Sequence, residues 1–299
     1  MTYIKILLSI IAVITVIMIT YMSYMYYNFK GYNILLEEGM YKINECNKNF
    51  MNYGYWDENT HSLNVASTKL VEKLLSKNKK QVFEAKQILD IGCGRGMQDI
   101  ILTKYTNANI TAIDIDVNNI IECKNLAKNN HVENKIKFIE ADACKLPFKD
   151  NSFDVIISLE SAFHYPSRKL FLNEVNRVLR PGGCFLLGDI LINKKSFLIH
   201  CLQQFICNQI HASHICDKDI DNLHLNLKKH NFKYEIENIT NSTFIPFYKN
   251  FIKNYRNKNN IVKILALLSS YILQYSQQYA DMFTYVIVSC LKQNSTLNV

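Results

Sequence analysis

Short apolar segments alternate with amphipathic ones from about residue 63 to residue 189, and this alternation constrains the fold more than any other feature. Apolar residues recur every three or four positions from Leu63 to Leu75, which predicts a helix. Strands are expected at 88–91, 109–114, 136–140, 153–159 and 184–189, and further helices from about 97, over 117–129 and over 167–179. Such alternation predicts a parallel sheet with helices on both faces.

The sequence after residue 189 is less regular. A helical stretch near 196–210 precedes a strand-like alternation at 232–238, an apolar helix at 261–275 and a final strand at 283–289. We expect one α/β domain over 51–299, with lid elements at about 190–229 and 244–280 that are rich in Phe, Ile, Leu and Tyr. With 20% charged and 48% hydrophobic residues, the chain is not intrinsically disordered.

Residues 6–27 carry no charged side chain, and Lys5 and Lys30 flank them. A helix that rises ~1.5 Å per residue covers the ~30 Å hydrocarbon core over such a run. A cleaved signal would need a small-residue cleavage site, which is missing, and an interfacial helix would need a charged face. The segment 1–30 is therefore predicted to be a single-span transmembrane anchor, followed by a juxtamembrane linker over 31–50.

The nine cysteines are dispersed and form no C-x-x-C pair. This usage predicts reduced thiols, and hence that the folded domain of the predicted single-pass membrane protein faces the cytosol. One group of cysteines and histidines has a spacing that could bind zinc: Cys207, His211, His214 and Cys216. The same residues also suit a lid helix, and we expect no metal. The net charge is +8 with scattered lysines, so we expect a lipid surface and no nucleic acid as partner.

The glycine-rich segment Asp90-Ile-Gly92-Cys-Gly94-Arg-Gly96 lies between an expected strand and an expected helix. Glycines let the backbone turn tightly and approach a ligand, and a helix start favours a negative group. The spacing is G-x-G-x-G, whereas a dinucleotide fingerprint reads G-x-G-x-x-G. Asp90 would repel a pyrophosphate and attract an amine. The segment therefore predicts a cofactor that joins an amino acid to a nucleoside, and it disfavours an NAD-dependent oxidoreductase.

Asp114 ends the second expected strand, about 20 residues beyond the first glycine. A carboxylate there can accept hydrogen bonds from both ribose hydroxyls. An aspartate at the end of a strand is more often a cap or turn residue. The prediction that Asp114 binds ribose therefore depends on its position relative to the glycine loop.

Four ordered motifs between about Ile88 and Asp189 resemble the class I S-adenosylmethionine-dependent methyltransferases. They read D-I-G-C-G-R-G, A-I-D-I-D, E-A-D-A-C-K-L-P-F-K-D-N-S-F-D and R-V-L-R-P-G-G. The resemblance implies a doubly wound, mostly parallel seven-stranded sheet of Rossmann-like type and S-adenosyl-L-methionine as cofactor. It also implies the following cofactor-binding residues: Asp90, Gly92, Gly94 and Gly96 at the methionine end, Asp114 at the ribose, Ile115, Asp142 and Ala143 at the adenine, and Ser158 where the fourth strand meets the cofactor.

Two further segments are similar to a narrower branch of that class. Tyr53-Gly-Tyr-Trp56 precedes the first helix, and Glu160-Ser-Ala-Phe-His164-Tyr-Pro follows the fourth strand. The branch includes sugar and natural-product O-methyltransferases, tocopherol and sterol C-methyltransferases, and phosphoethanolamine N-methyltransferases. The resemblance implies that Tyr53 closes over the cofactor and faces the acceptor, although Trp56 also suits a core position.

Three residues are candidates for catalysis. The resemblance implies that His164 lies near the transferred methyl group, where an imidazole suits a base for a hydroxyl acceptor; a loop hydrogen bond is the alternative. Asp189 is expected to orient that imidazole or to bind the acceptor. Glu160 is expected to stabilise a cationic intermediate in C-methylation, or to cap the following turn.

These patterns together predict a membrane-anchored methyltransferase that acts on a small, hydrophobic or lipid-like acceptor through O-, C- or N-methylation. A regulatory module that binds the cofactor without catalysis is one alternative. A methyltransferase for a macromolecule is another, but the fourth strand ends in Ser158-Leu-Glu-Ser161, without the N/D-P-P-Y/F tetrapeptide of nucleic-acid enzymes.

Overall fold

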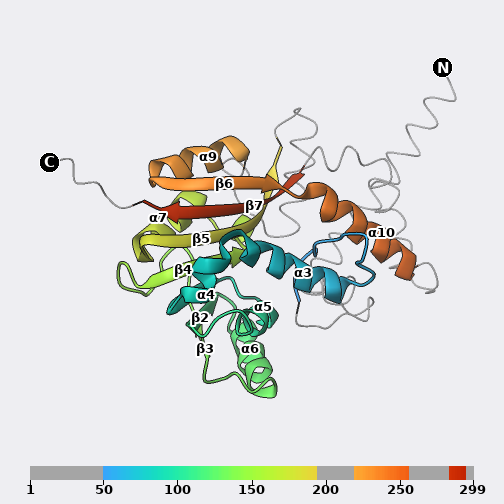
Figure 1. Ribbon diagram of the computed structural model, residues 1–299, viewed down its shortest axis with the longest axis horizontal. Coiled ribbons are helices and arrows are strands. Elements are labelled where there is room, and N and C mark those ends of the chain that lie inside the picture. Colours follow the sequence, from blue (N-terminus) through green and yellow to red (C-terminus); the bar gives the residue numbers. More distant parts are fainter. Residues whose placement is uncertain (1–49, 194–218, 256–282, 294–299) are drawn as a thin grey trace, which may run out of the picture. The chain divides into compact units, whose positions relative to one another are not determined.

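The computed structural model describes residues 50–193, 219–255 and 283–293, whose strands form one seven-stranded sheet (Figure 1). The strands are β1 (Gln87–Ile91), β2 (Asn109–Asp114), β3 (Ile136–Glu140), β4 (Phe153–Leu159), β5 (Leu179–Ile192), β6 (Phe232–Asn238) and β7 (Phe283–Lys292). The α-helices are α3 (Leu63–Leu75), α4 (Lys79–Glu84), α5 (Met97–Leu102), α6 (Val117–Asn129), α7 (Arg168–Val178), α9 (Ile220–Lys229) and α10 (Phe244–Tyr255).

The strand order is β3-β2-β1-β4-β5-β7-β6. Strands β1 to β5 are parallel to one another, and β7 runs antiparallel to both β5 and β6. The order reverses between β1 and β4, and ligands of open α/β sheets bind outside the carboxyl ends of the strands at such a switch point. The expectation of a doubly wound, mostly parallel seven-stranded sheet is confirmed.

Each face of the sheet has its own buried apolar cluster. Alternate residues of a strand point to opposite faces, so Ile88 packs with α3, α5 and α6 while Leu89 packs with α7 and α9. Leu70 of α3 and Phe171 of α7 are fully buried in these two clusters. Because both faces of the sheet are covered, the central strands have mostly apolar sequences.

The bounds of most elements agree with the sequence prediction. The structure has β2, α6, β3, β4 and β6 at the expected residues. Strands β5 and β7 extend beyond the predicted ends, to Ile192 and Lys292. The largest boundary error is at the start of β5, where Arg180-Pro-Gly-Gly183 was expected to separate a helix from a strand beginning at Cys184. Strand β5 instead begins at Leu179, because Leu179 pairs with Phe153 of β4 before a register shift at Val155.

Several predicted segments lie outside the described residues. They include the anchor at 6–27, the zinc-like cluster at 207–216 and the apolar helix at 261–275. No helix in the ranges described above has the length and apolarity that crossing a membrane requires. The described ends of the expected lid at 190–229 belong to β5 and to α9, whose Leu223 is buried in the core.

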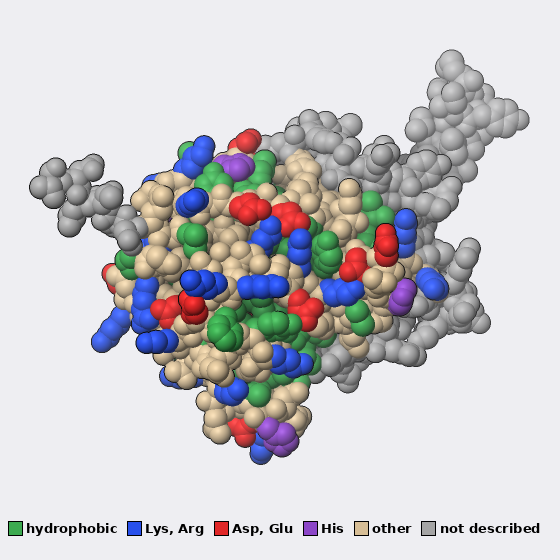
Figure 2. Space-filling model, viewed as in Figure 1, with side chains coloured by type: hydrophobic (Ala, Val, Ile, Leu, Met, Phe, Trp, Pro, Cys, Tyr) green, Lys and Arg blue, Asp and Glu red, His purple; other side chains and the backbone are tan. Residues whose placement is uncertain are grey.

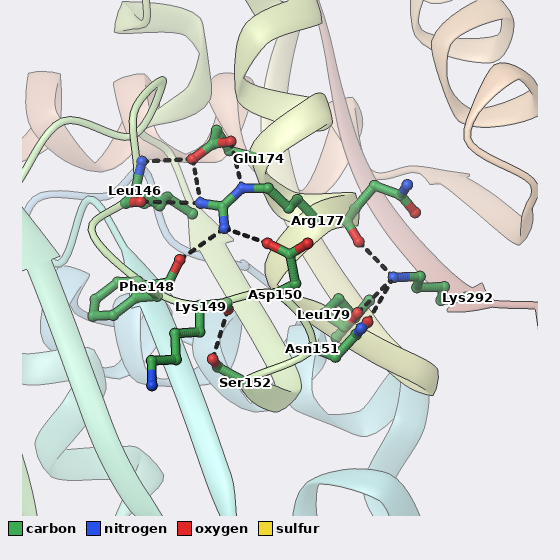
Figure 3. Close-up of polar contacts among 11 residues, drawn as sticks. Leu146, Phe148, Lys149, Asp150, Asn151, Ser152, Glu174, Arg177, Leu179 and Lys292 are labelled. Atoms are coloured by element: carbon green, nitrogen blue, oxygen red, sulfur yellow. Dashed lines mark hydrogen bonds and ion pairs between the residues drawn. The ribbon is translucent and has the colours of Figure 1, made fainter.

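Arg177 of α7 holds the connection between β3 and β4 (Figure 3). Its guanidinium donates to the carbonyls of Leu146 (3.0 Å) and Phe148 (2.7 Å), and to the carboxylates of Glu174 (2.8 and 2.7 Å) and Asp150 (2.8 Å). A planar fork of five donors suits such a set of acceptors. Arg177 is the first residue of the motif R-V-L-R-P-G-G. It thus fixes the loop that contains the motif beginning E-A-D-A-C, which starts at the carboxyl end of β3.

Lysine and arginine side chains are interspersed with acidic ones on the face that Figure 2 shows. Ion pairs also join α3 and its following turn to β6: Lys73 lies 2.8 Å from Glu237, and Lys77 lies 3.1 Å from Glu235 and 2.8 Å from Glu237. Part of the positive charge is therefore offset by neighbouring carboxylates.

Candidate functional site

The glycine loop between β1 and α5 has a left-handed backbone at each of its three glycines. The φ angles are 78° at Gly92, 55° at Gly94 and 82° at Gly96. A Cβ atom at Gly92 would clash with Ser161, so this glycine is required by packing. A Cβ at Gly94 would meet only the flexible Met51 side chain, at 3.3 Å. The absence of a Cβ at Gly94 therefore lets other groups come close to the loop backbone on the side where Met51 packs.

Asp114 at the end of β2 is fixed against this loop. Its Oδ2 accepts from the Gly94 N–H at 2.9 Å, and its Oδ1 accepts from the Asp116 N–H at 2.9 Å and from the Asn119 amide at 3.2 Å. Burial raises the pKa of Asp114 above its ordinary value. A carboxylate has about four lone-pair positions, so a held Asp114 still has capacity for a ligand hydroxyl.

Asp90 is the second-last residue of β1, two positions before the first glycine of the loop, and is 1% exposed. The amide of Gln98 donates to its Oδ2. Within the described part of the chain, its Oδ1 has no amide, hydroxyl or amine donor. Burial raises the pKa of Asp90 to about 6. An orphaned carboxylate oxygen beside an open glycine loop fits a ligand that brings an ammonium group.

The predicted adenine contacts lie at the ends of β2 and β3. Ile115 is 72% exposed, which is high for a large apolar side chain and suits contact with a planar ring. Asp142 is exposed, with its side chain accepting from the Cys144 N–H at 2.7 Å, and Ala143 is buried. The cradle therefore fits a nucleoside linked to an amino acid.

Ser158 belongs to a network of hydroxyl groups that the sequence did not reveal. Its Oγ lies 2.8 Å from Ser161 Oγ, and both Ser161 and Tyr165 donate to the Ile91 carbonyl, at 3.0 and 3.1 Å. Ser158 is fully buried. The network joins the end of β4 to the end of β1. The only sequence feature that points to it is the spacing of hydroxyl residues after β4.

Glu160 follows β4 with a left-handed backbone (φ 50°), which is uncommon for a residue other than glycine. Its Oε1 accepts from the Tyr53 N–H and from the Tyr285 hydroxyl, each at 2.9 Å. Burial raises the pKa of Glu160 to about 8. The Tyr53 ring packs edge-on against Phe244 at 5.0 Å and Phe247 at 4.9 Å between ring centroids. The structure thus brings Tyr53 and Glu160 together.

His164 and Asp189 have different surroundings. His164 is half-buried at the end of a short 3-10 helix (Ala162–His164), with 4.1 Å between the centroids of its ring and the Phe163 ring. Asp189 is fully buried in β5 and pairs with Arg168, with 2.5 Å between Oδ2 and Nη2. The expectation that Asp189 orients His164 or binds the acceptor stays a prediction, and the ion pair with Arg168 is a contact that sequence reasoning missed.

No cluster of three or more potential metal-ligating side chains occurs among the residues that the structure describes. The cysteines of this part, Cys93, Cys123, Cys144, Cys184 and Cys290, are free thiols. Cys93 and Cys123 lie beside the glycine loop with 3.9 Å between their sulfur atoms.

Comparison with known proteins agrees with this geometry. Residues 89–187 match the family model described as a methyltransferase domain. The chain is 35% identical over 142 residues to 27-O-demethylrifamycin SV methyltransferase of Amycolatopsis mediterranei, covering 48% of this chain and 52% of that protein. It is 34% identical over 149 residues to fatty-acid O-methyltransferase of Mycolicibacterium smegmatis, covering 47% and 52%. The chain thus spans about half the length of these relatives.

A solved structure shares the fold. Geranyl diphosphate C-methyltransferase from Streptomyces coelicolor, in complex with Mg²⁺, geranyl diphosphate and S-adenosyl-L-homocysteine, superposes with a TM-score of 0.65. The two are 14% identical, and the match covers 84% of this chain and 93% of that one. Over residues 89–187 this chain is therefore similar to methyltransferase domains, and its described residues share the fold of a solved methyltransferase.

Proposed function

We propose that this chain is an active S-adenosylmethionine-dependent methyltransferase whose acceptor is a small hydrophobic or lipid-like molecule. The contact between the Gly94 N–H and Asp114 Oδ2, at 2.9 Å, carries the proposal. It joins a loop that is open to a ligand to a carboxylate suited to ribose hydroxyls, and this combination fits a nucleoside with an amino-acid end.

The residues that would hold the cofactor come from three strand ends. Asp90 would accept from its ammonium group and Asp114 from its ribose hydroxyls. Ile115 and Ala143 would contact the adenine ring, and Asp142 would accept from the adenine amino group. Support comes from the orphaned Oδ1 of Asp90 and the exposure of Ile115.

The bound cofactor supplies a methyl group that its sulfonium has already activated. The protein then has to align the acceptor, exclude water and accept a proton. Tyr53 is suited to the first two tasks, because its backbone is fixed by Glu160 and its ring by Phe244 and Phe247.

The proton acceptor depends on the acceptor atom. For a hydroxyl acceptor we assign His164, because an imidazole titrates near neutral pH and this one is half-buried beyond β4. For a carbon acceptor we assign Glu160, whose carboxylate form would stabilise a cationic intermediate. Its raised pKa, about 8, makes that form dominant only at alkaline pH in the protein without ligand.

The relatives support the acceptor class. One is named for demethylrifamycin and another for fatty acids. We also propose that residues 6–27, which carry no charge, anchor the chain as a single span with the domain facing the cytosol. Deleting residues 1–30 is then expected to release the protein from the membrane fraction, and retention there would contradict the anchor.

Radiolabelled methyl donor, added with the full chain to membrane and soluble extracts, tests the proposed activity. Label is expected in a small organic-extractable product, and Asp114→Asn is expected to reduce it strongly. Labelled protein or nucleic acid would instead identify a macromolecular acceptor. Cofactor binding without label in any fraction would favour the regulatory module.

A further inference from the structure

Glu160, the residue after β4, is held by two donors that meet at one of its two carboxylate oxygens. The Tyr53 N–H and the Tyr285 hydroxyl both donate to Oε1, each at 2.9 Å. Within the part of the chain that the structure describes, Oε2 receives no hydrogen bond. A carboxylate has about four lone-pair positions, so the two donors fill those of Oε1 and leave those of Oε2 for a ligand.

The backbone of Glu160 contributes to the same arrangement. Its N–H donates to the Gly188 carbonyl of β5 at 2.7 Å, and its φ angle of 50° is left-handed. A residue other than glycine keeps such a conformation where the surrounding structure fixes it, and these conformations are concentrated at functional sites. The backbone and the two donors together fix one orientation of the carboxylate.

Tyr285 presents its hydroxyl from a backbone that is fixed on both sides. It pairs with Ile190 of β5, its N–H donates to the Thr240 hydroxyl at 2.9 Å, and its carbonyl accepts from the Ile239 N–H at 2.9 Å. The side chain is fully buried, and its ring packs edge-on against Phe244 with 5.9 Å between centroids. The sheet therefore determines where the Tyr285 hydroxyl lies.

The charges near Glu160 leave Tyr285 in the role of a neutral donor. Asp189 of β5 is a charged neighbour of Glu160 and is itself paired with Arg168 of α7 at 2.5 Å. The 3-10 helix that follows Glu160 carries His164 as a further titratable group. Burial, followed by the charge of Glu160, raises the pKa of Tyr285 well above its ordinary value. The Tyr285 hydroxyl therefore keeps its proton at neutral pH.

We propose that Tyr285 is a positioning residue for methyl transfer: its hydroxyl and the Tyr53 N–H fix Glu160 through Oε1, so that Oε2 is the oxygen that faces the acceptor. This inference rests on the proposed function. Phe244 packs against the rings of both donor residues, so the carboxylate and the aromatic side chains form one unit. No covalent bond changes at Tyr285, and its proton stays on the phenol oxygen.

Tyr285→Phe removes the hydroxyl and keeps the ring. Tyr234→Phe is the matched control on the neighbouring strand β6, where the hydroxyl lies 2.9 Å from His224 Nδ1. The full chain is assayed for transfer of radiolabelled methyl from saturating S-adenosylmethionine to organic-extractable products of a membrane extract. Tyr285→Phe is expected to lower the rate about tenfold, because a hydrogen bond to a charged group is lost. Calorimetric binding of S-adenosylhomocysteine is expected to stay unchanged in both variants.

The pH profile and a double variant separate positioning from packing. Burial raises the pKa of Glu160 to about 8, and the hydrogen bonds from Tyr53 and Tyr285 oppose this rise. Without the Tyr285 donor, the rising limb of the rate profile is expected to move to higher pH by about one unit. In a Glu160→Gln background, Tyr285→Phe is expected to change the rate by less than about twofold, because the carboxylate on which Tyr285 acts is missing.

The outcomes that contradict the proposal are distinct. An unshifted pH profile, or the same loss of rate in the Glu160→Gln background, would assign Tyr285 to packing and overturn the positioning role. Equal losses in Tyr285→Phe and Tyr234→Phe would do so as well. A wild-type rate that Tyr285→Phe leaves unchanged refutes this inference alone. Absence of labelled product with wild type refutes the proposed function, and with it the acceptor that Oε2 would face.

Discussion

Arg168 and Asp189 form an ion pair with 2.5 Å between Nη2 and Oδ2, and neither side chain is exposed to solvent. The pair joins the first turn of α7 to the middle of β5. Its effect reaches the candidate site, because burial and then the charge of Asp189 raise the pKa of Glu160. A charge buried in the core thus influences a carboxyl group at the end of β4.

Arg168→Met is expected to lower the free energy of unfolding by about 3–5 kcal/mol, because it leaves the Asp189 carboxylate buried without its cation. Urea denaturation followed by circular dichroism measures this loss. The double variant Arg168→Met/Asp189→Leu replaces both charges and is expected to recover most of the stability. A loss below about 1 kcal/mol in the single variant would show that the pair matters little, as surface pairs do.

The elements that the sequence predicted well are those whose signal is local. Strands β2 and β4 and helix α6 have the expected bounds because apolar periodicity and caps act within a few residues. Asp116, for example, caps α6 by accepting from the Asn118 N–H at 2.8 Å. The start of β5 was missed because pairing with β4 outweighs the turn preference of Pro181 and Gly182.

The sequence predicted most residues of the candidate site, but it did not predict which side chains they contact. Asp90 and Asp114 were expected from their place at strand ends beside the glycine loop, and Glu160 from a segment after the fourth strand that resembles a methyltransferase branch. Their partners come from distant parts of the chain: Tyr285 is 125 residues from Glu160.

Asp114→Asn is expected to weaken binding of S-adenosylhomocysteine by at least about tenfold, because hydrogen bonds to a charged acceptor contribute about 1.5–3 kcal/mol. Calorimetric titration measures the change. Asp116→Asn is the matched control: Asp116 lies two residues away, and asparagine caps a helix as well as aspartate does. Equal losses in the two variants would point to a general disturbance of the loop.

Gly94→Ala is expected to reduce cofactor affinity more than stability. The left-handed backbone (φ 55°) costs about 1–2 kcal/mol with an L side chain, and the added Cβ would lie 3.3 Å from the Met51 side chain and narrow the approach to the loop. Gly182→Ala introduces the same kind of strain at φ 75°, with nothing within 4 Å of the new Cβ. Similar melting temperatures with weaker binding only in Gly94→Ala are expected. Unchanged binding would place the ligand elsewhere.

The free energy of unfolding is expected to fall as pH rises from about 5 to about 8, and Glu160 contributes to this fall. The pKa of Glu160 is raised from 4.5 to about 8 by burial, so between these values the folded protein holds a proton that the unfolded chain releases. The stability gained from this proton is complete below pH 4.5 and lost as pH rises through 8. One proton corresponds to about 1.4 kcal/mol per pH unit.

Glu160→Gln removes this titration and keeps an acceptor for Tyr53 and Tyr285, so its stability is expected to decline less steeply than that of wild type. The comparison is cleanest above pH 6, because the pKa of Asp90 lies at about 6 and its contribution changes mainly below that value. Urea denaturation at half-unit pH steps gives both slopes. Parallel slopes for wild type and Glu160→Gln between pH 6 and 8 would mean that Glu160 is ionised in the folded protein, and that its carboxylate is available for a cationic intermediate at neutral pH.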